Sequence, residues 1–317
     1  MPYSYIIFYA DTVRRLLHFQ GEGVMGDRAQ SLSHIVLEAA CSIANAVKAR
    51  ALFLCADSPE YYSLIEPLLD KTDIVFVTRR AERVEDEWPQ VKNVLYIPKI
   101  DLTRLGQIKI AVLMGLAAGL VDGSDRIVCV AGLPRLHHLD NILVLDLGKE
   151  FELLTANKGA NMIGTVRPEV FEGVLNLVIE LANQGREGKP VGTIFTLGDH
   201  EKVLQFSRQL VINPFRGYPE EERHLLDRNL RETIREFSAI DGAFVIRDDG
   251  VVITAGRHLN AALEEGELPR GLGSRHVAAA GITAVTDAVA VAISESTGTI
   301  RIFKNGAILM EIEKASR

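Results

Sequence analysis

The chain has 317 residues, of which 47% are hydrophobic and 24% charged, a composition typical of globular proteins and a length that suits two ordinary domains. Acidic residues number 42 against 35 Lys and Arg, so the formal net charge is −7. Binding to polymeric DNA or RNA usually depends on a basic excess that neutralises phosphates. The composition therefore argues against a nucleic acid polymer as partner, although a local cationic pocket could still hold one nucleotide.

Three cysteines, Cys41, Cys55 and Cys129, lie in apolar runs and form no C-x-x-C pair. This pattern argues against a disulfide framework and a thiolate metal site, and predicts buried thiols in a reducing, cytoplasmic compartment. No cationic leader precedes the apolar stretch near the N-terminus, and the longest apolar run, between Lys109 and Asp122, is too short to cross a bilayer. We therefore expect no signal peptide and no membrane association.

The first half of the sequence alternates between short apolar runs and helical patterns. The runs lack period-two alternation, so they predict strands buried on both faces, at residues 51–57, 73–80, 94–98, 126–132 and 142–148. The clearest helical patterns cover 31–50 and 102–120. Strands that alternate with helices predict right-handed crossovers and a mostly parallel sheet. We expect an α/β domain over residues 1–158.

The second half has a different order of elements. Residues 153–168 contain Gly159, Gly164 and Pro168 and no long apolar run, which predicts a domain boundary and a second domain over residues 165–317. Helices are expected at 169–184, 219–240 and 273–289, and strands at 192–199, 242–247, 251–256, 289–295, 298–306 and 307–313. This order predicts a mixed sheet flanked by helices.

A glycine-rich segment precedes the last predicted helix. Gly271 and Gly273 let backbone approach an anion closely, and the helix N-terminus offers N–H groups and partial positive charge. Arg275 adds a planar pair of donors, and His276 can donate, accept or bind a metal. These features predict a phosphate site. A simple helix start, capped by Ser274 and with Arg275 in solvent, remains an alternative.

Two further polar segments follow or precede strands. In Asp241-Gly242-Ala243, the carboxylate can hold Mg²⁺ or Mn²⁺ or accept a proton, and the glycine leaves room for a substrate. Ser294 and Glu295 end another strand, where sites are often built. Taken singly, these segments are better explained as an ordinary Asp-Gly turn and a polar hairpin end.

Together, the three segments resemble the diadenylate cyclase family, which carries a D-G-A motif, then G-[TS]-R-H, then a strand that ends in S-E. The matching stretches are DGAFVIRDDGVVITAGRHL (241–259), GLGSRHVAAAGIT (271–283) and VAVAISESTGTIRIFKNG (289–306). The strand at 192–199 is similar to the first strand of that domain, so the resemblance covers residues 165–317. The subtype is similar to the archaeal type, often called DacZ, whose N-terminal domain resembles the C-terminal domain of pyruvate kinase. Residues 38–65 have that pattern of helix, strand and helix.

The resemblance implies roles for individual residues. Asp241 matches the catalytic aspartate, which helps to hold the metal and favours the attacking hydroxyl, and His276 matches a histidine that contacts phosphate or metal. The implied ATP contacts are Gly242, Ala243, Leu259 at the adenine, Gly273, Ser274, Arg275, Ser294 and Glu295. Two positions depart from the family: many members have a second Arg at Val277 and an acid at Ser296.

The implied reaction joins two ATP molecules into cyclic di-AMP and releases two pyrophosphates, with Mn²⁺ or Mg²⁺ at the phosphates. Positioning and charge stabilisation are the protein's part in such phosphoryl transfer. Because one site holds one ATP, the resemblance also implies self-association of two domains face to face. The isolated monomer is then expected to be inactive.

Other functions compete with this prediction. The pattern Gly21-x-Gly23-x-x-Gly26 matches a dinucleotide fingerprint, but the preceding segment is a poor buried strand and the next acid at a strand end, Asp57, is too distant. No P-loop motif is present. His137-His138 with Asp140 is better explained as a surface loop than as a metal pair. A non-catalytic, nucleotide-binding regulator remains the second hypothesis.

Overall fold

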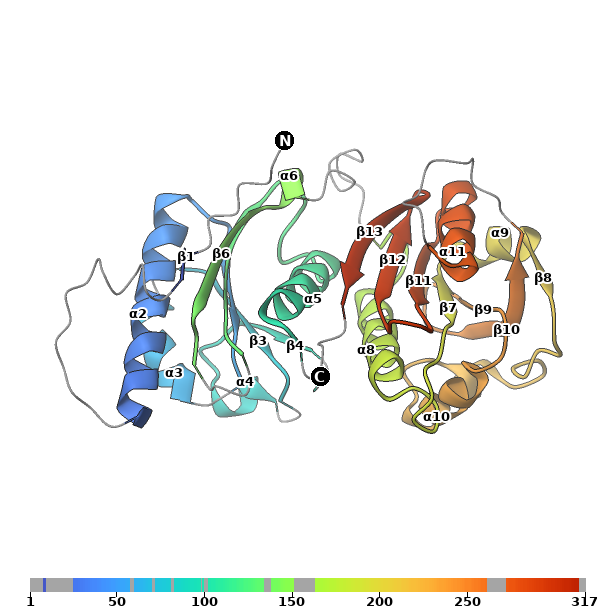
Figure 1. Cartoon of the computed structure of the whole chain (residues 1–317), viewed down its shortest axis with the longest axis horizontal. Helices are drawn as coiled ribbons and strands as arrows, with labels where there is room; N and C mark the ends of the chain where they lie inside the picture. Colours follow the sequence, from blue (N-terminus) through green and yellow to red (C-terminus); the bar gives the residue numbers. More distant parts are fainter. Residues whose placement is uncertain are drawn as a thin grey trace. The chain divides into compact units, whose positions relative to one another are not determined.

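A computed structural model describes residues 8–9, 25–57, 60–69, 72–80, 83–97, 99, 102–133, 138–150, 163–260 and 272–313. The chain divides into two compact units, Met1–Thr155 and Ala156–Arg317, each built around its own sheet (Figure 1). The described helices include none with the length and apolar character to cross a membrane.

The N-terminal unit contains a six-stranded sheet in the order β1-β6-β5-β2-β3-β4. The strands are β1 (Phe8–Tyr9), β2 (Ala51–Cys55), β3 (Ile74–Thr78), β4 (Asn93–Tyr96), β5 (Arg126–Ala131) and β6 (Asn141–Asp146). The four strands β2 to β5 are parallel, whereas β6 is antiparallel to β5 and β1 is antiparallel to β6. All five strands predicted from the apolar runs are present, and the α/β class is confirmed.

Helices cover both faces of this sheet (Figure 1). They are α2 (Met25–Ala46), α3 (Glu60–Ile65), the 3₁₀ turn η1 (Glu66–Leu68), α4 (Val84–Glu87), α5 (Arg104–Ala117) and α6 (Leu147–Glu150). On one face, α2 and α3 pack against Leu52 and Leu54 in one buried cluster. On the other face α5 approaches β2 so closely that a Cβ on Gly115 would lie 2.7 Å from the ring of Phe53. Helix α2 includes Gly26, while Gly21 and Gly23 of the same motif lie outside the described residues.

The C-terminal unit contains a seven-stranded sheet in the order β13-β12-β11-β7-β9-β10-β8. The strands are β7 (Ile194–Leu197), β8 (Ser207–Gln209), β9 (Ala243–Ile246), β10 (Val252–Leu259), β11 (Val289–Ile293), β12 (Ile300–Lys304) and β13 (Ala307–Ile312). Only the β7–β9 pair is parallel among these pairings. The predicted mixed sheet is therefore confirmed, and β8 is a strand that the sequence did not predict.

The helices of this unit are α8 (Pro168–Gln184), α9 (His200–Gln205), the 3₁₀ turn η3 (Glu220–Arg223), α10 (Arg228–Phe237) and α11 (Ser274–Val285). The small residues of α11 pack with Val203 of α9 over the alanine-rich face of the sheet. Toward α10, Phe244 stacks on Phe195 at 4.8 Å and contacts Phe215, which also meets Phe237.

The predicted helix over 219–240 is wrong in its extent. Residues Glu220–Arg223 form only a 3₁₀ turn, and His224 then pairs with Val251 as an isolated β-bridge. The α-helix begins after Asp227, whose side chain accepts a hydrogen bond from the N–H of Asn229 at 2.9 Å. An aspartate in this position satisfies one of the N–H groups that a helix start leaves unpaired, so it fixes the first residue of α10.

Candidate active site

The strand pairing of the C-terminal unit brings two acidic residues to one edge of the sheet. Strands β7 and β9 are parallel, with Ile194 opposite Ala243, so both begin at this edge. Strand β11 is antiparallel to β7 and ends there. Asp241 lies two residues before β9 and Glu295 two residues after β11, so residues 54 positions apart in sequence come to the same ends of the two strands that flank β7.

The first turn of α11 meets these two acids. Arg275 donates from Nη2 to Oδ1 of Asp241 at 2.9 Å and from Nη1 to Oε2 of Glu295 at 3.0 Å. Gly273, in extended conformation, is the N-cap, and no side chain caps the helix. The alternative of a helix capped by Ser274 with a solvated Arg275 is therefore wrong. The three motif segments predicted from the sequence meet at the Arg275 guanidinium.

Glycines allow the backbone of this edge to pack closely. Gly242 has φ +111°, and a Cβ there would lie 2.6 Å from both the Arg257 nitrogen and the Gly256 carbonyl carbon. A Cβ on Gly192 would lie 2.8 Å from Cβ of Glu295 and 3.1 Å from Nη1 of Arg275. Both positions therefore require glycine, on steric grounds and, at Gly242, also because of the left-handed backbone.

His276 faces inward from α11 and is 4% exposed. Its Nε2 lies 3.2 Å from Nη1 of Arg301, which also donates from Nε to Glu311 at 2.7 Å. Because a guanidinium can only donate, Nε2 must accept and the proton must sit on Nδ1. Burial, and then the charge of Arg301, lower the pKa of His276. With Nε2 as an acceptor the ring is neutral, and its buried Nδ1–H has no hydrogen-bond partner among the described residues.

Comparison with known proteins assigns both units. The family described as "DisA bacterial checkpoint controller nucleotide-binding" matches residues 180–308, and "Probable sensor domain DacZ_P" matches residues 27–155. A diadenylate cyclase of Methanocaldococcus jannaschii is 28% identical over 303 residues, which are 89% of this chain and 97% of the relative. Residues 180–308 thus match this nucleotide-binding family, and the chain is similar to diadenylate cyclases over most of its length.

A second relative, the diadenylate cyclase of Haloferax volcanii, is 42% identical over 148 residues, which are 46% of this chain and 53% of that protein. A crystal structure of DacA from Staphylococcus aureus superimposes with a TM-score of 0.31 and 20% identity over 46% of this chain and 87% of that one. At that score the superposition carries no part of the argument. The family assignment rests on the two matched domains and the sequence relatives.

The other residues implied by the diadenylate cyclase resemblance lie around the same edge. Ala243 is the buried first residue of β9. Leu259 is 5% exposed and ends β10, two residues beyond Arg257, which pairs with Ala243. The Ser294 hydroxyl lies 3.3 Å from that of Ser296 and accepts from the N–H of Thr297, so it shapes the turn after β11.

Three residues of the candidate site were not predicted from sequence. Gly192 lies beneath the Arg275–Glu295 contact, and Arg301 and Glu311 fix the orientation of His276. The available signal was a charged residue within the apolar strand segment IRIF, where a charge facing a helix needs a partner. Pattern alone does not say that this partner is the histidine of the motif.

No group of three His, Cys, Asp or Glu side chains in the described part of the chain is arranged as a metal site. Asp241 nevertheless suits a hard divalent ion, because its side chain is 83% exposed and only Oδ1 is bonded among the described residues. His276 does not offer a lone pair in this geometry, since Nε2 accepts from Arg301. His138 lies 3.5 Å from Asp140, which also pairs with Arg104, and His137 lies outside the described residues.

Proposed function

We propose that this chain condenses two ATP molecules into cyclic di-AMP and releases two pyrophosphates. The observation that carries the proposal is the position of Arg275, which lies at the start of α11 and contacts both Asp241 and Glu295. A helix start, a guanidinium and an exposed carboxylate together suit a nucleoside triphosphate with a divalent ion.

The Arg275 contacts are well placed to exchange for phosphate oxygens. The side chains of Asp241 and Glu295 are 83% and 61% exposed, and ion pairs at such exposure contribute about 0–1 kcal/mol. A triphosphate brings several negative charges and can accept bidentate hydrogen bonds from the guanidinium. We propose that the triphosphate replaces Asp241 and Glu295 as the partner of Arg275, and that it accepts further hydrogen bonds from Ser274 and the first N–H groups of α11.

His276 would donate its Nδ1–H to a phosphate oxygen beside Gly273. The Nδ1 atom lies 4.0 Å from the position that a Cβ on Gly273 would occupy, so the glycine leaves the approach open. A buried N–H without a partner is costly, and a bound phosphate would satisfy it. Arg301 and Glu311 are positioning residues in this account, because they fix the protonation of the ring and do not touch the substrate.

Asp241 would hold the divalent ion, Mn²⁺ or Mg²⁺, through the carboxylate that is released when the triphosphate binds Arg275. Such an ion supplies neutralisation of the charge that develops on the phosphate oxygens. Asp241 would also lie near the ribose 3′-hydroxyl, whose oxygen bonds to the α-phosphorus of the other ATP while the bond to pyrophosphate breaks. The hydroxyl proton leaves to the carboxylate or to water, and two such steps close the ring.

One such site holds one ATP, so the complete reaction requires two sites to face each other. A contact related by two-fold symmetry makes the two bond-forming steps equivalent. We propose that two C-terminal units associate in this way and that Leu259, Gly242 and Ala243 line the nucleoside. A dilution series should then show activity that falls faster than protein concentration.

A regulator that binds ATP without turnover is the second candidate. Val277, 40% exposed on the first turn of α11, supports it, because many family members carry a second Arg there. Turnover distinguishes the two functions.

The test incubates the purified full chain with ATP and Mn²⁺ or Mg²⁺ and identifies nucleotides by mass spectrometry. Asp241→Asn is compared with Asp248→Asn, the same change in the β9–β10 turn. Cyclic di-AMP from the wild type and Asp248→Asn, and none from Asp241→Asn, supports the proposal. Intact ATP that remains bound favours the regulator. If the protein neither binds ATP nor forms product, both functions are refuted.

A further inference from the structure

The N-terminal unit contains a pocket at the carboxyl edge of its parallel strands. From the end of β2 the chain continues through α3 to β3 on one side, whereas from the end of β5 it turns to β6 on the other side. The neighbouring strands β2 and β5 are parallel, so their exits diverge. In open α/β sheets this divergence creates the crevice where ligands bind.

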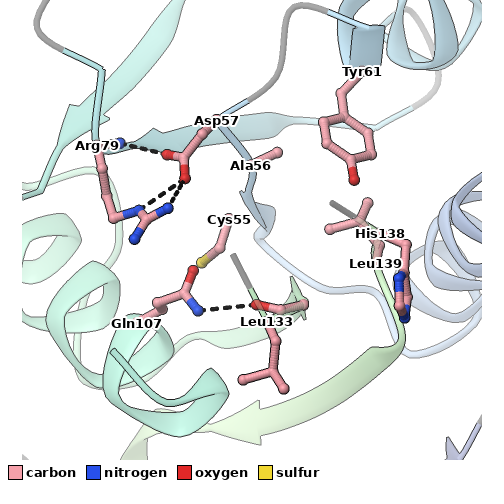
Figure 2. A pocket seen from close by; sticks show the side chains of 10 residues that line it. Cys55, Ala56, Asp57, Tyr61, Arg79, Gln107, Leu133, His138 and Leu139 are labelled. Carbon is pink, nitrogen blue, oxygen red and sulfur yellow. Dashed lines mark hydrogen bonds and ion pairs between the residues drawn. The ribbon is translucent and has the colours of Figure 1, made fainter. Parts of the chain in front are cut away.

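The pocket occupies this crevice and has a volume of about 440 Å³, including its open mouth. Residues that follow β2, β3 and β5 line it, together with side chains from α3 and α5, and Figure 2 shows them around a common space. The enclosed part of the pocket has a volume of about 100 Å³, which is less than the about 300–1,000 Å³ of drug-sized sites. The pocket therefore suits a small molecule, or one end of a metabolite that extends into the open mouth, whereas a polymer does not fit.

The charged groups around the pocket are paired with each other. Asp57 accepts hydrogen bonds from the N–H of Arg79 at 2.7 Å and from its Nε at 2.8 Å, and also contacts Nη2 (Figure 2). On the opposite side, Asp140 pairs with Arg104 and lies beside His138. Burial raises the pKa of Cys55 to about 12, so this thiol adds no charge. A charged ligand would have to break one of these pairs, and an unpaired buried charge is costly.

Gln107 provides a directional group at the base of the pocket. It is 4% exposed, and its Nε2 donates to the carbonyl of Gly132 at 3.0 Å, which fixes the orientation of the amide. Its Oε1 accepts no hydrogen bond from the described residues, and in Figure 2 it points away from Leu133 on the side of Cys55. This oxygen is therefore available to accept a hydrogen bond from a molecule in the pocket. Tyr61 directs its hydroxyl toward the same space (Figure 2).

We propose that this pocket binds a small, uncharged, polyhydroxyl molecule, with one hydroxyl donating to Oε1 of Gln107. Hydroxyl groups both donate and accept, which suits a wall of amide, phenol and imidazole groups whose ion pairs are already complete. The matched family of this unit is described as a probable sensor domain, and the proposal gives that unit a binding site and a class of ligand. It does not depend on the activity of the C-terminal unit.

The test measures binding to the full chain by saturation-transfer difference NMR. The probes are ribose and glucose, each compared with its phosphorylated form, ribose 5-phosphate and glucose 6-phosphate. Gln107→Met removes the acceptor at similar size, and Gln90→Met makes the same change at an exposed position of the same unit. We expect an uncharged sugar to bind the wild type and Gln90→Met, and to bind Gln107→Met about fivefold more weakly or worse.

Three results would overturn the proposal. Binding of the phosphorylated probes alone would show that the charge argument is wrong. Equal affinity of the sugar for Gln107→Met and the wild type would show that the ligand binds elsewhere. If no probe binds at millimolar concentration, the pocket is not a site for this class of ligand. If Gln107→Met does not fold, Ala56→Leu serves instead, because it narrows the pocket without altering the amide and should likewise abolish binding.

Discussion

Substitution of Gly242 by Ala tests the backbone arrangement of the candidate site. The residue has φ +111°, and an L residue held in such a conformation costs about 1–3 kcal/mol. The new Cβ would also lie 2.6 Å from two backbone atoms of β10, and overpacking of this kind costs about 1–3 kcal/mol more. The sum, about 2–6 kcal/mol, corresponds to a loss of about 5–20 °C in the melting temperature of a domain of this size.

Gly217→Ala is the matched control for this prediction. Its φ is +91°, but no atom of the described residues lies within 4 Å of the added Cβ, so only the conformational cost applies, about 1–3 kcal/mol. Differential scanning calorimetry of both variants should show the larger loss for Gly242→Ala, and only that variant should lose activity, because it displaces Asp241. Equal shifts in melting temperature would refute the inference that β9 and β10 approach this closely.

Three other predictions follow from described contacts. Arg301→Met should reduce kcat by about tenfold or more while changing the melting temperature little, because the proton of His276 is then no longer held on Nδ1. An unchanged pH profile of kcat would contradict this prediction. The pKa of His276 is lowered by burial and by Arg301, so its stabilising effect is complete above the unfolded pKa of about 6.5 and is lost as pH falls through the folded pKa. As the pH is lowered, the melting temperature of His276→Gln should therefore fall less steeply than that of the wild type. Asp227→Ala should destabilise by about 1 kcal/mol through loss of the α10 cap, with activity unchanged; a wild-type melting temperature would contradict the cap.

The local pattern of apolar residues in the sequence was sufficient to predict much of the fold. The apolar runs predicted all the described strands except β1 and β8, because buried strands leave a strong signal in the sequence. The start of α10 was missed because it depends on the Asp227 cap and on the His224–Val251 bridge. The end of α11 was also missed, because the backbone becomes extended at Thr286. Strand β8, with three residues, is too short to leave a periodic pattern.

The candidate site was predictable as a set of motifs, but its internal contacts were not. The order of the three motifs indicated the family, yet the role of Arg275 as the link between Asp241 and Glu295 depends on strand register. In the same way, the contact of His276 with Arg301 depends on which face of β12 meets α11. Long-range pairing of this kind is set by tertiary packing, which local periodicity does not encode.

The central claim is that Arg275 at the start of α11 binds the triphosphate of ATP. Isothermal titration with α,β-methylene-ATP and Mg²⁺ tests it in the wild type, Arg275→Gln and the control Arg228→Gln, which changes an exposed arginine on α10. Loss of a charge-assisted, bidentate contact is expected to weaken binding by about tenfold or more, with Arg228→Gln unchanged. Equal affinity in Arg275→Gln and the wild type would contradict the claim.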